Sequence, residues 1–528
     1  MGEKKSLFRG MEGHGTIMRK HHILTAVAAA AVFSLGASTL TLAGEESTSG
    51  GTFTYARSDS TTSFDLHQEI TENNAFAIDK VFESLVTFDN DGNIIDWLAE
   101  DHKISDDGLI YTFTLRDGLK FSDGTDVTAE DVKFSIERHL EVGGSLPIEA
   151  DVKSVEAVDE KTVEITLGTA YTPFLSELAN FSNGIIPKDF GGKTEEEFFK
   201  NPVGTGPFAV SEWDPSGDLT FVKNEYYWQE GKTYIDELVY KVVDDDNQAL
   251  NQLLAGEIDG IEDLSLSNAS NVDGNADTKT ATSFSYNVEE LFFNTLDEHF
   301  SDEHVRRALA MAIDRESLTK ALTFGYAEIA NTVLPRALLY QTNDTVNALS
   351  YDIDAAKEEL AQSAYPDGFD TTISIASGNN TRLQEAQIIQ AAGAQIGINI
   401  EINAQEISTF RSDFRDLNFS MMINSATADY PDANSIFAFQ VDPDGWSKCY
   451  WTSYNNETAA DLMRKGQVTP DGDERAAVYE ELQQILADEV PYIPLYNSEN
   501  VVGLRDNVEG FTVLPNGSVH FEDVYFEE

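Results

Sequence analysis

Residues 111–132 place a strand, two tight turns and a helix start in immediate succession. Apolar and polar side chains alternate over 111–115, which predicts a strand with one buried face. Asp-Gly pairs at 117–118 and 123–124 predict turns, because glycine accepts the left-handed backbone that such turns require. The sequence Thr-Ala-Glu-Asp at 128–131 resembles a capping box and predicts a helix that begins there. Taken alone, the segment predicts a strand, a hairpin and a helix and contains no catalytic pattern.

The same segment resembles the signature of the family 5 extracellular solute-binding proteins, the peptide-binding receptors of ABC importers. The family pattern is close to YTF.LR.G.KF.DG.P.TA.DV. Further stretches resemble the family in the same order along the chain, and together they leave little room for coincidence. These stretches are Gly51-Thr-Phe-Thr-Tyr55, Asn201-Pro-Val-Gly-Thr-Gly-Pro-Phe208, Asn224-Glu-Tyr-Tyr-Trp228, Leu254-Ala-Gly-Glu-Ile-Asp259, Asn294-Thr295, the helix-like run from Val305 to Glu316, Ala428-Asp-Tyr-Pro-Asp432 and Val490-Pro-Tyr-Ile-Pro-Leu495.

The resemblance implies an α/β chain with the two-lobed periplasmic-binding-protein fold (type II, cluster C-like), an extra subdomain in lobe I and a hinge between the lobes. The roughly 485 residues after position 43 also exceed one hydrophobic core, which favours two or three domains. Carried over from the family, the expected boundaries are 44–88 in lobe I, 89–200 in the subdomain, 201–285 in lobe I, 286–494 in lobe II and 495–528 in the return to lobe I, with crossings near 283–294 and 491–502.

Periodicity predicts a parallel α/β unit in the second half of the chain. Residues 372–377 alternate like a strand, 382–396 carry a helical pattern, and 398–402 alternate again. This order suggests two parallel strands joined by a right-handed crossover. Apolar stripes at 305–313 and 478–486 predict two further amphipathic helices.

Residues 1–43 are predicted to be a signal peptide whose true start is Met18. A charged stretch precedes the apolar run 23–42, and Thr41-Leu-Ala43 supplies small residues before a cleavage site. The alternative is a membrane anchor, but the run is rich in Ala, Ser, Thr and Gly, and a polar domain follows at once. We therefore expect export and a mature chain that begins near Gly44.

Cysteine usage argues against a lipid anchor. Leu42-Ala-Gly44 resembles the first three residues of a lipobox, but Glu45 occupies the position where the lipidated cysteine would stand. The chain has one cysteine, Cys449, so an internal disulfide is also excluded. We expect a free periplasmic protein of a two-membrane bacterium, with an unanchored secreted protein as the alternative.

The chain carries 92 acidic and 35 basic residues, for a formal net charge of −57. Such a charge would repel nucleic acids and anionic lipid surfaces, which we exclude as partners. It is consistent with adaptation to a saline habitat, with attraction of cationic ligands, or with a solvated surface that only maintains solubility. The hydrophobic content of 41% is ordinary, so disorder is not implied.

Catalytic motifs are missing from the sequence. It contains no His-Glu-x-x-His helix, no Gly-x-Ser-x-Gly elbow and no Cys/His cluster with zinc spacing. His299 and His304 flank Asp302 and Glu303, so a metal site is conceivable, but exposed residues at a helix start are favoured. Cys449 is a weak nucleophile candidate. We expect a binding protein and not an enzyme, with no cofactor and no metal.

Asp429 is the principal candidate for ligand binding. It follows an alternating run at 419–423 and lies, with Tyr430, in the segment that resembles the family site for the α-ammonium group of a peptide. An enclosed carboxylate gives a cationic ligand end a charge-assisted hydrogen bond. The alternative is that Asp429 caps the turn made with Pro431.

Other candidate ligand contacts are less closely tied to family motifs. Peptide-binding relatives usually carry tryptophan three residues before this aspartate, where this chain has Ala426, so a larger or different ligand is conceivable. Aromatic residues nearby in sequence could line the cleft, although aromatic rings more often belong to the core, and a bidentate guanidinium could receive a ligand carboxylate. The candidates are the aromatic residues Trp446, Tyr450 and Trp451 and the basic residues Arg382 and Arg411.

The resemblance implies a periplasmic receptor that captures di- or oligopeptides between two lobes and delivers them to an inner-membrane permease, whose transmembrane subunits work with a cytoplasmic ATPase. The alternatives are a non-peptide cargo such as a nickel chelate, an oligosaccharide or an opine, and, more remotely, a secreted hydrolase. We expect a monomer.

If the acidic surface is an adaptation to salt, stability should rise with ionic strength, because screening relieves repulsion among the net 57 negative charges. The melting temperature of the mature protein, measured from low salt to about 1 M sodium chloride, checks this, since salt screens exposed charges at such concentrations. An unchanged or falling melting temperature would contradict the hypothesis.

Overall fold

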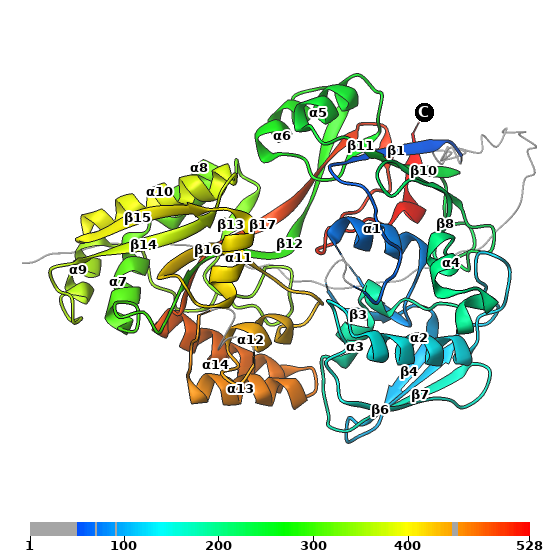
Figure 1. Ribbon diagram of the computed structural model, residues 1–528, viewed down its shortest axis with the longest axis horizontal. Helices are drawn as coiled ribbons and strands as arrows, with labels where there is room; N and C mark the ends of the chain where they lie inside the picture. The colour runs from blue at the N-terminus through cyan, green and yellow to red at the C-terminus, as the bar shows by residue number, and fades with distance from the viewer. Residues whose placement is uncertain (1–49, 69–70, 90–91, 446–451, 528) are drawn as a thin grey trace, which may run out of the picture. The chain divides into compact units, whose positions relative to one another are not determined.

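The computed structural model describes residues 50–68, 71–89, 92–445 and 452–527 (Figure 1). It is a mixed α/β structure whose largest element is an 11-stranded sheet, so the predicted α/β class is confirmed. The sheet contains, in spatial order, β15 (Ile398–Gln405), β14 (Phe369–Ala376), β16 (Met421–Thr427), β12 (Thr278–Phe293), β17 (Tyr492–Arg505), β11 (Gly260–Ile261), β1 (Thr52–Arg57), β10 (Glu237–Val242), β9 (Leu219–Lys223) and β8 (Phe208–Trp213), with β13 (Ala327–Ile329) paired to β17.

Strands β12 and β17 are the two longest strands and form an antiparallel pair in the middle of this sheet. On one side of this pair, β12 is hydrogen-bonded to β16. On the other side, β17 is hydrogen-bonded to β11, which is followed in the sheet by β1. These two strands lie where the sequence predicts the crossings between lobes. We name the two parts by the boundaries expected from the family resemblance, with lobe I for residues 50–285 and 495–527 and lobe II for residues 286–494.

Three small sheets complete the β structure. A four-stranded antiparallel sheet lies within the expected subdomain. One two-stranded sheet directly precedes it in the chain, and another lies near the C-terminal end. The four-stranded sheet has the order β4 (Ala99–Ile104), β5 (Ile110–Leu115), β7 (Thr162–Leu167) and β6 (Val152–Ala157), and the pairs are β2 (Val86–Phe88) with β3 (Ile94–Asp96) and β18 (Val508–Glu509) with β19 (Tyr525–Phe526).

Helices cover these sheets and are mostly short. The α-helices are α1 (Glu72–Val81), α2 (Ala129–Val142), α3 (Phe174–Leu178), α4 (Glu195–Lys200), α5 (Asp246–Leu254), α6 (Leu266–Asp273), α7 (Glu303–Ala312), α8 (Arg315–Leu322), α9 (Ile353–Leu360), α10 (Asn380–Gln395), α11 (Ile407–Arg415), α12 (Asn434–Gln440), α13 (Glu457–Val468) and α14 (Asp473–Glu489). The described residues also include the short 3₁₀ segments η1 (Phe181–Asn183), η2 (Lys188–Gly192) and η4 (Phe521–Asp523).

The signature segment folds as predicted. Alternate residues of β5 are buried, and Gly118 and Gly124 have φ values of 75° and 86°, in the left-handed region expected of the two turns. Helix α2 begins directly after Thr128, whose backbone N–H donates to Asp131 Oδ2 at 2.7 Å. This bond satisfies a backbone donor at the helix start and confirms the capping interaction.

The predicted α/β unit is also confirmed. Strands β14 and β15 are parallel, with Phe369 opposite Ile398 and Ala376 opposite Gln405, and α10 connects them. The two predicted amphipathic helices are α7 and α14. Ile373, Ile389 and Met421 are fully buried in the apolar core of this lobe.

Glycines in the segment Asn201-Pro-Val-Gly-Thr-Gly-Pro-Phe208 allow close packing against the end of α1. A Cβ atom at Gly204 would overlap the Val81 carbonyl oxygen, and one at Gly206 would overlap that of Lys80. The Gly206 N–H donates to the Val81 carbonyl at 2.9 Å. This packing fixes the chain that follows α1, which forms part of the cavity described below.

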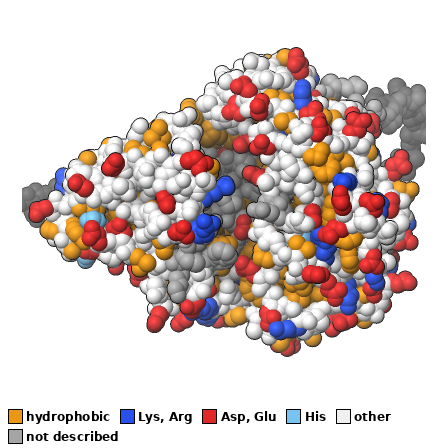
Figure 2. Space-filling view, viewed as in Figure 1, with side chains coloured by type: hydrophobic (Ala, Val, Ile, Leu, Met, Phe, Trp, Pro, Cys, Tyr) orange, Lys and Arg blue, Asp and Glu red, His pale blue; other side chains and the backbone are white. Residues whose placement is uncertain are grey.

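The predicted signal peptide, residues 1–43, lies outside the described residues. In the described part of the chain, no helix is long and apolar enough to cross a membrane. Asp and Glu side chains are spread over the face shown in Figure 2, with fewer Lys and Arg among them. The acidic composition is therefore displayed on the surface.

Replacing Gly204 by alanine should destabilise the fold by about 1–3 kcal/mol or more, because the added methyl group meets backbone and not a movable side chain. Urea-induced unfolding measures the change. Gly217→Ala is a matched control, since an added Cβ there meets only the flexible side chain of Asp214. Equal stabilities of the two variants would contradict the packing argument.

Candidate functional site

A cavity of about 440 Å³ is lined by residues from both lobes. Lobe I contributes α1 and the chain after it, the turn around Asn180 and the C-terminal stretch 514–522. Lobe II contributes residues 286–287 of β12 and residues 427–431, which begin at the last residue of β16. Segments far apart in the sequence therefore meet around one space, which fits a ligand site at a junction of lobes.

Strand β12 contributes the cavity wall through an irregularity. Its pairing with β17 is interrupted between Phe284 and Val288, and residues 285–287 line the cavity. The Tyr286 N–H donates to the Pro515 carbonyl at 3.0 Å, and the Tyr286 carbonyl accepts from the Ala428 N–H at 2.9 Å. A bulge redirects side chains locally, and here it joins the C-terminal stretch to the Asp429 segment.

Asp429 lines the cavity with its side chain exposed to that space while protein atoms surround it. Its N–H donates to Ser435 Oγ at 2.8 Å, and its carbonyl accepts from Asn180 Nδ2 at 2.7 Å. Burial, followed by the charge of Glu149, raises the pKa of Asp429 to about 6. Among the described residues no basic side chain pairs with this carboxylate, so its backbone is fixed and its charge is free for a ligand.

Turn capping in this segment belongs to Asp432. Its Oδ1 accepts from the Asn434 N–H at 2.8 Å, and both its oxygens bind the guanidinium of the fully buried Arg475, at 2.6 and 2.8 Å. In the described structure no turn amide donates to the Asp429 carboxylate. The carboxylate that caps this turn is thus that of Asp432, and ligand contact by Asp429 stays a prediction.

Tyr430 also lines the cavity, but its ring is buried. Its hydroxyl lies 3.2 Å from the hydroxyl of Tyr171 and accepts from Asn434 Nδ2 at 3.2 Å. The Tyr171 hydroxyl also donates to Glu149 Oε2 at 3.1 Å. Tyr430 therefore takes part in a polar contact between the two lobes beside Asp429.

The two candidate arginines lie elsewhere. Arg382, in the first turn of α10, donates from Nε and a terminal nitrogen to the Glu289 carboxylate at 2.6 and 3.1 Å. Arg411 is exposed on α11, and neither residue lines the cavity. The predicted role of these arginines at a ligand carboxylate receives no support from the structure, because Glu289 already neutralises Arg382 and Arg411 faces solvent.

The candidate aromatic residues Trp446, Tyr450 and Trp451, and also Cys449, lie outside the described residues. Ala426, which replaces the tryptophan of peptide-binding relatives, is buried in β16.

Sequence reasoning missed a carboxylate in the cavity wall, Glu83. Its Oε1 accepts from Trp97 Nε1 at 2.8 Å, and its Oε2 accepts from Trp228 Nε1 at 3.1 Å. Burial raises the pKa of Glu83 to about 7. The segment Asn224-Glu-Tyr-Tyr-Trp228 was recognised as a family motif, but nothing local in it indicates a partner so distant along the chain.

Two paired cations also line the cavity. Lys80 Nζ lies 3.0 Å from Asp79 Oδ1 and donates to Ser518 Oγ at 3.0 Å. His520 Nδ1 lies 2.7 Å from Glu522 Oε1. The Glu522 carboxylate raises the pKa of His520 against the effect of burial, and the imidazolium lowers that of Glu522. Both cations thus have an anionic partner within the protein.

One hydroxyl group of the cavity wall has no hydrogen-bond partner among the described residues. The Tyr286 hydroxyl is buried and forms no hydrogen bond within the described structure, although the residue lines the cavity. A buried hydroxyl ordinarily has a partner, so it is available to a ligand.

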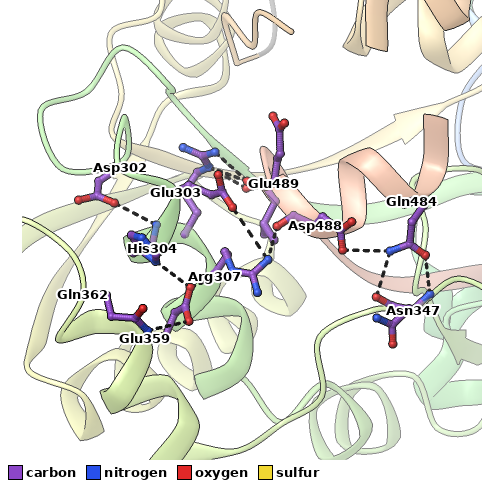
Figure 3. Close-up of polar contacts among 12 residues, drawn as sticks. Asp302, Glu303, His304, Arg307, Asn347, Glu359, Gln362, Gln484, Asp488 and Glu489 are labelled. Carbon is purple, nitrogen blue, oxygen red and sulfur yellow. Dashed lines mark hydrogen bonds and ion pairs between the residues drawn. The ribbon is translucent and has the colours of Figure 1, made fainter. Parts of the chain in front are cut away.

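The histidines considered as metal ligands have other partners. His304 Nδ1 and Arg307 Nε each lie 2.9 Å from Glu359 Oε1, in a polar network that joins α7 to α9 (Figure 3). His299 stacks on Phe369 with ring centroids 4.1 Å apart. No group of three potential metal ligands occurs among the residues that the structure describes. The favoured interpretation holds in part, because His304 lies partly exposed at the start of α7, whereas His299 lies before the helix and its side chain is only 16% exposed.

Comparison with known proteins agrees with the fold and the motifs. The family model for bacterial extracellular solute-binding proteins, family 5 Middle, matches residues 93–448. The glutathione-binding protein GsiB of Escherichia coli O1:K1 is 28% identical over 452 residues, which are 84% of this chain and 88% of GsiB.

Solved structures show the same architecture. The periplasmic binding protein DppA from Helicobacter pylori, in complex with the peptide STSA, has a TM-score of 0.75 and 27% identity and covers 91% of this chain and 99% of its own. AgaA from A. tumefaciens, in complex with agropinic acid, has a TM-score of 0.75 and 26% identity over 90% and 99% of the two chains. These neighbours confirm the two-lobed periplasmic-binding-protein fold. The chain belongs to family 5 of the bacterial extracellular solute-binding proteins.

Proposed function

We propose that this solute-binding protein captures peptides in the cavity between its lobes and delivers them to an ABC permease. The observation that carries the proposal is the Asp429 carboxylate, which faces the cavity with no basic partner in the described structure. The α-ammonium group of a peptide supplies the missing charge and three hydrogen-bond donors. The complex of DppA with STSA supports peptide as the cargo class.

The remaining parts of the function follow from this role. The receptor is exported by residues 1–43, works as a free monomer in the periplasm and meets the transmembrane subunits of a permease with a cytoplasmic ATPase. Peptide amides are met by polar groups of the cavity such as the Tyr286 hydroxyl. The receptor binds and releases its cargo without chemical change, in agreement with a family of substrate-binding receptors.

A non-peptide cargo is the second candidate, favoured by the structural similarity to AgaA in complex with agropinic acid. Mass spectrometry of the small molecules that co-purify with the protein distinguishes the two. Peptides among them would support the proposal, whereas only opine-like or other non-peptide solutes would contradict it. Hydrolysis of pooled peptides by the pure protein would overturn the receptor role.

Replacing Asp429 by asparagine should weaken peptide binding by about 1.5–3 kcal/mol, the range for hydrogen bonds to charged groups. The substitution keeps the side-chain size and removes the charge, so an N-acetylated peptide should bind the wild type poorly and lose much less. Calorimetry with both peptides on both proteins measures this. Asp367→Asn, at an exposed site away from the cavity, is the matched control. Equal affinity of wild type and Asp429→Asn for the free-amine peptide would contradict the ammonium contact.

The same substitution should stabilise the ligand-free protein at neutral pH. The raised pKa of Asp429 means that the native state holds its proton more tightly than the unfolded state, so wild-type stability falls as pH rises from about 4 to 6. Because cavity water screens part of this effect, Asp429→Asn should gain on the order of 1 kcal/mol above this window and nothing below it.

Urea unfolding of both proteins without ligand, at a pH on each side of the window, measures the difference. A loss of stability in the variant would indicate a structural role for the carboxylate, such as a turn cap.

A further inference from the structure

The cavity contains more carboxylates than cations. Five carboxylate side chains line it, against one lysine and one histidine, and no arginine occurs among the described lining residues. The carboxylates belong to Glu72, Asp79, Glu83, Asp429 and Glu522.

Both cations are already neutralised within the protein. Lys80 pairs with Asp79, whose other oxygen accepts from Ser518, and His520 pairs with Glu522. A ligand carboxylate therefore finds no unpaired basic side chain in the described cavity wall. An anionic ligand would have to lose its water without a compensating charge, which is costly.

Three carboxylates remain without a cation. Glu72 at the start of α1, Glu83 and Asp429 form no ion pair with a basic side chain in the structure as described. Glu83 is held by neutral donors, the indoles of Trp97 and Trp228 and the hydroxyl of Tyr227, which orient the carboxylate but do not neutralise it. A charged carboxylate without a compensating cation is costly in a partly dry site, and a cationic group of a ligand lowers that cost.

An aromatic ring stands beside Glu83 in the cavity wall. Trp97 lines the cavity and is half-buried, whereas the neighbouring Trp228 ring is covered by Arg116, whose guanidinium carbon lies 4.9 Å from the ring centroid. Trp97 packs edge-on against Trp228, with centroids 5.4 Å apart. The His520 ring also lies near Trp97, with centroids 6.2 Å apart and planes tilted by 45°, so it does not stack on the indole. A carboxylate next to an indole ring that lines the cavity is a favourable setting for an ammonium or guanidinium group.

Resting on the proposed peptide receptor function, we propose that the cargo is a cationic peptide, with its amino terminus on Asp429 and a lysine or arginine side chain on Glu83 beside Trp97. Peptides with acidic side chains are rejected, because they place like charges together without a partner. The inference concerns the charge class of the cargo.

The test compares peptides that differ only in the charge of one side chain. Calorimetry with Ala-Lys-Ala, Ala-norleucine-Ala and Ala-Glu-Ala is carried out on the ligand-free mature protein, and norleucine matches the lysine stem without its charge. Ala-Lys-Ala should bind at least about tenfold more tightly than the norleucine peptide, as expected for one charge-assisted hydrogen bond, and Ala-Glu-Ala more weakly still. Equal affinity for all three would overturn the inference and leave the peptide receptor standing. Failure of all three to bind would overturn both.

A variant locates the side-chain site. In Glu83→Gln the ratio of the norleucine to the lysine Kd should fall towards one, whereas Glu358→Gln, an exposed control on α9, should keep the wild-type ratio. Retention of the lysine preference in folded Glu83→Gln would overturn the assignment to Glu83. If thermal unfolding shows that Glu83→Gln does not fold, the peptide series on the wild type still decides the charge class.

Discussion

Antiparallel pairing of β12 with β17 connects the two lobes, whose segments together line the cavity. The 11-stranded sheet continues from lobe II to lobe I only through these two strands. Ladder hydrogen bonds hold both ends of the pair, while the irregularity at 285–287 frees backbone groups in the middle. Those groups bind Pro515 and Ala428, so the same local break that interrupts the sheet assembles the cavity wall. A regular ladder at this position would satisfy the strands and leave these two segments without their anchor.

Asp429 and Asp432 lie three residues apart but have different surroundings, because only the charge of Asp432 is paired with a basic side chain within the described structure. Asp432 is buried with Arg475, which satisfies both of its oxygens, and loss of one partner from such a pair is strongly destabilising. Asp429 has its backbone fixed by Ser435 and Asn180, but its carboxylate is left without a cation. The protein tolerates this cost in the free state, and in the proposed complex a cationic ligand removes it on binding. In that complex, part of the binding free energy would come from relief of the electrostatic cost that the unpaired carboxylate imposes on the ligand-free protein.

Local features of the sequence were sufficient for much of the fold. The capping pair Thr128 and Asp131 and the β14-α10-β15 unit depend on neighbours within a few residues or on a single periodicity, and both formed as predicted. Whether a candidate arginine is free to bind a ligand depends on its tertiary contacts, which the local sequence does not specify. Arg382 has the right chemistry for a ligand carboxylate, but Glu289, 93 positions away in sequence, occupies it.

The same reason explains why Glu83 was missed. Its importance arises from Trp97 and Trp228, the second of which is 145 positions away, and from packing of the Gly204 segment against α1. Asp429 was found only because its surrounding residues resemble a family motif, and Trp446 and Trp451 remain expectations because they lie outside the described residues.

The acidic surface and the acidic cavity act on a cationic ligand in the same direction but over different distances. The electric field of a net charge of −57 raises the local concentration of cations and speeds their encounter with the protein. Salt screens this field, which decays over a Debye length of about 10 Å at 0.1 M ionic strength. The ligand contacts proposed at Asp429 and Glu83 lie in a partly dry space and would be screened much less. Added salt therefore slows association more than it speeds dissociation, so at high ionic strength selectivity for charge is carried by the cavity and not by the surface.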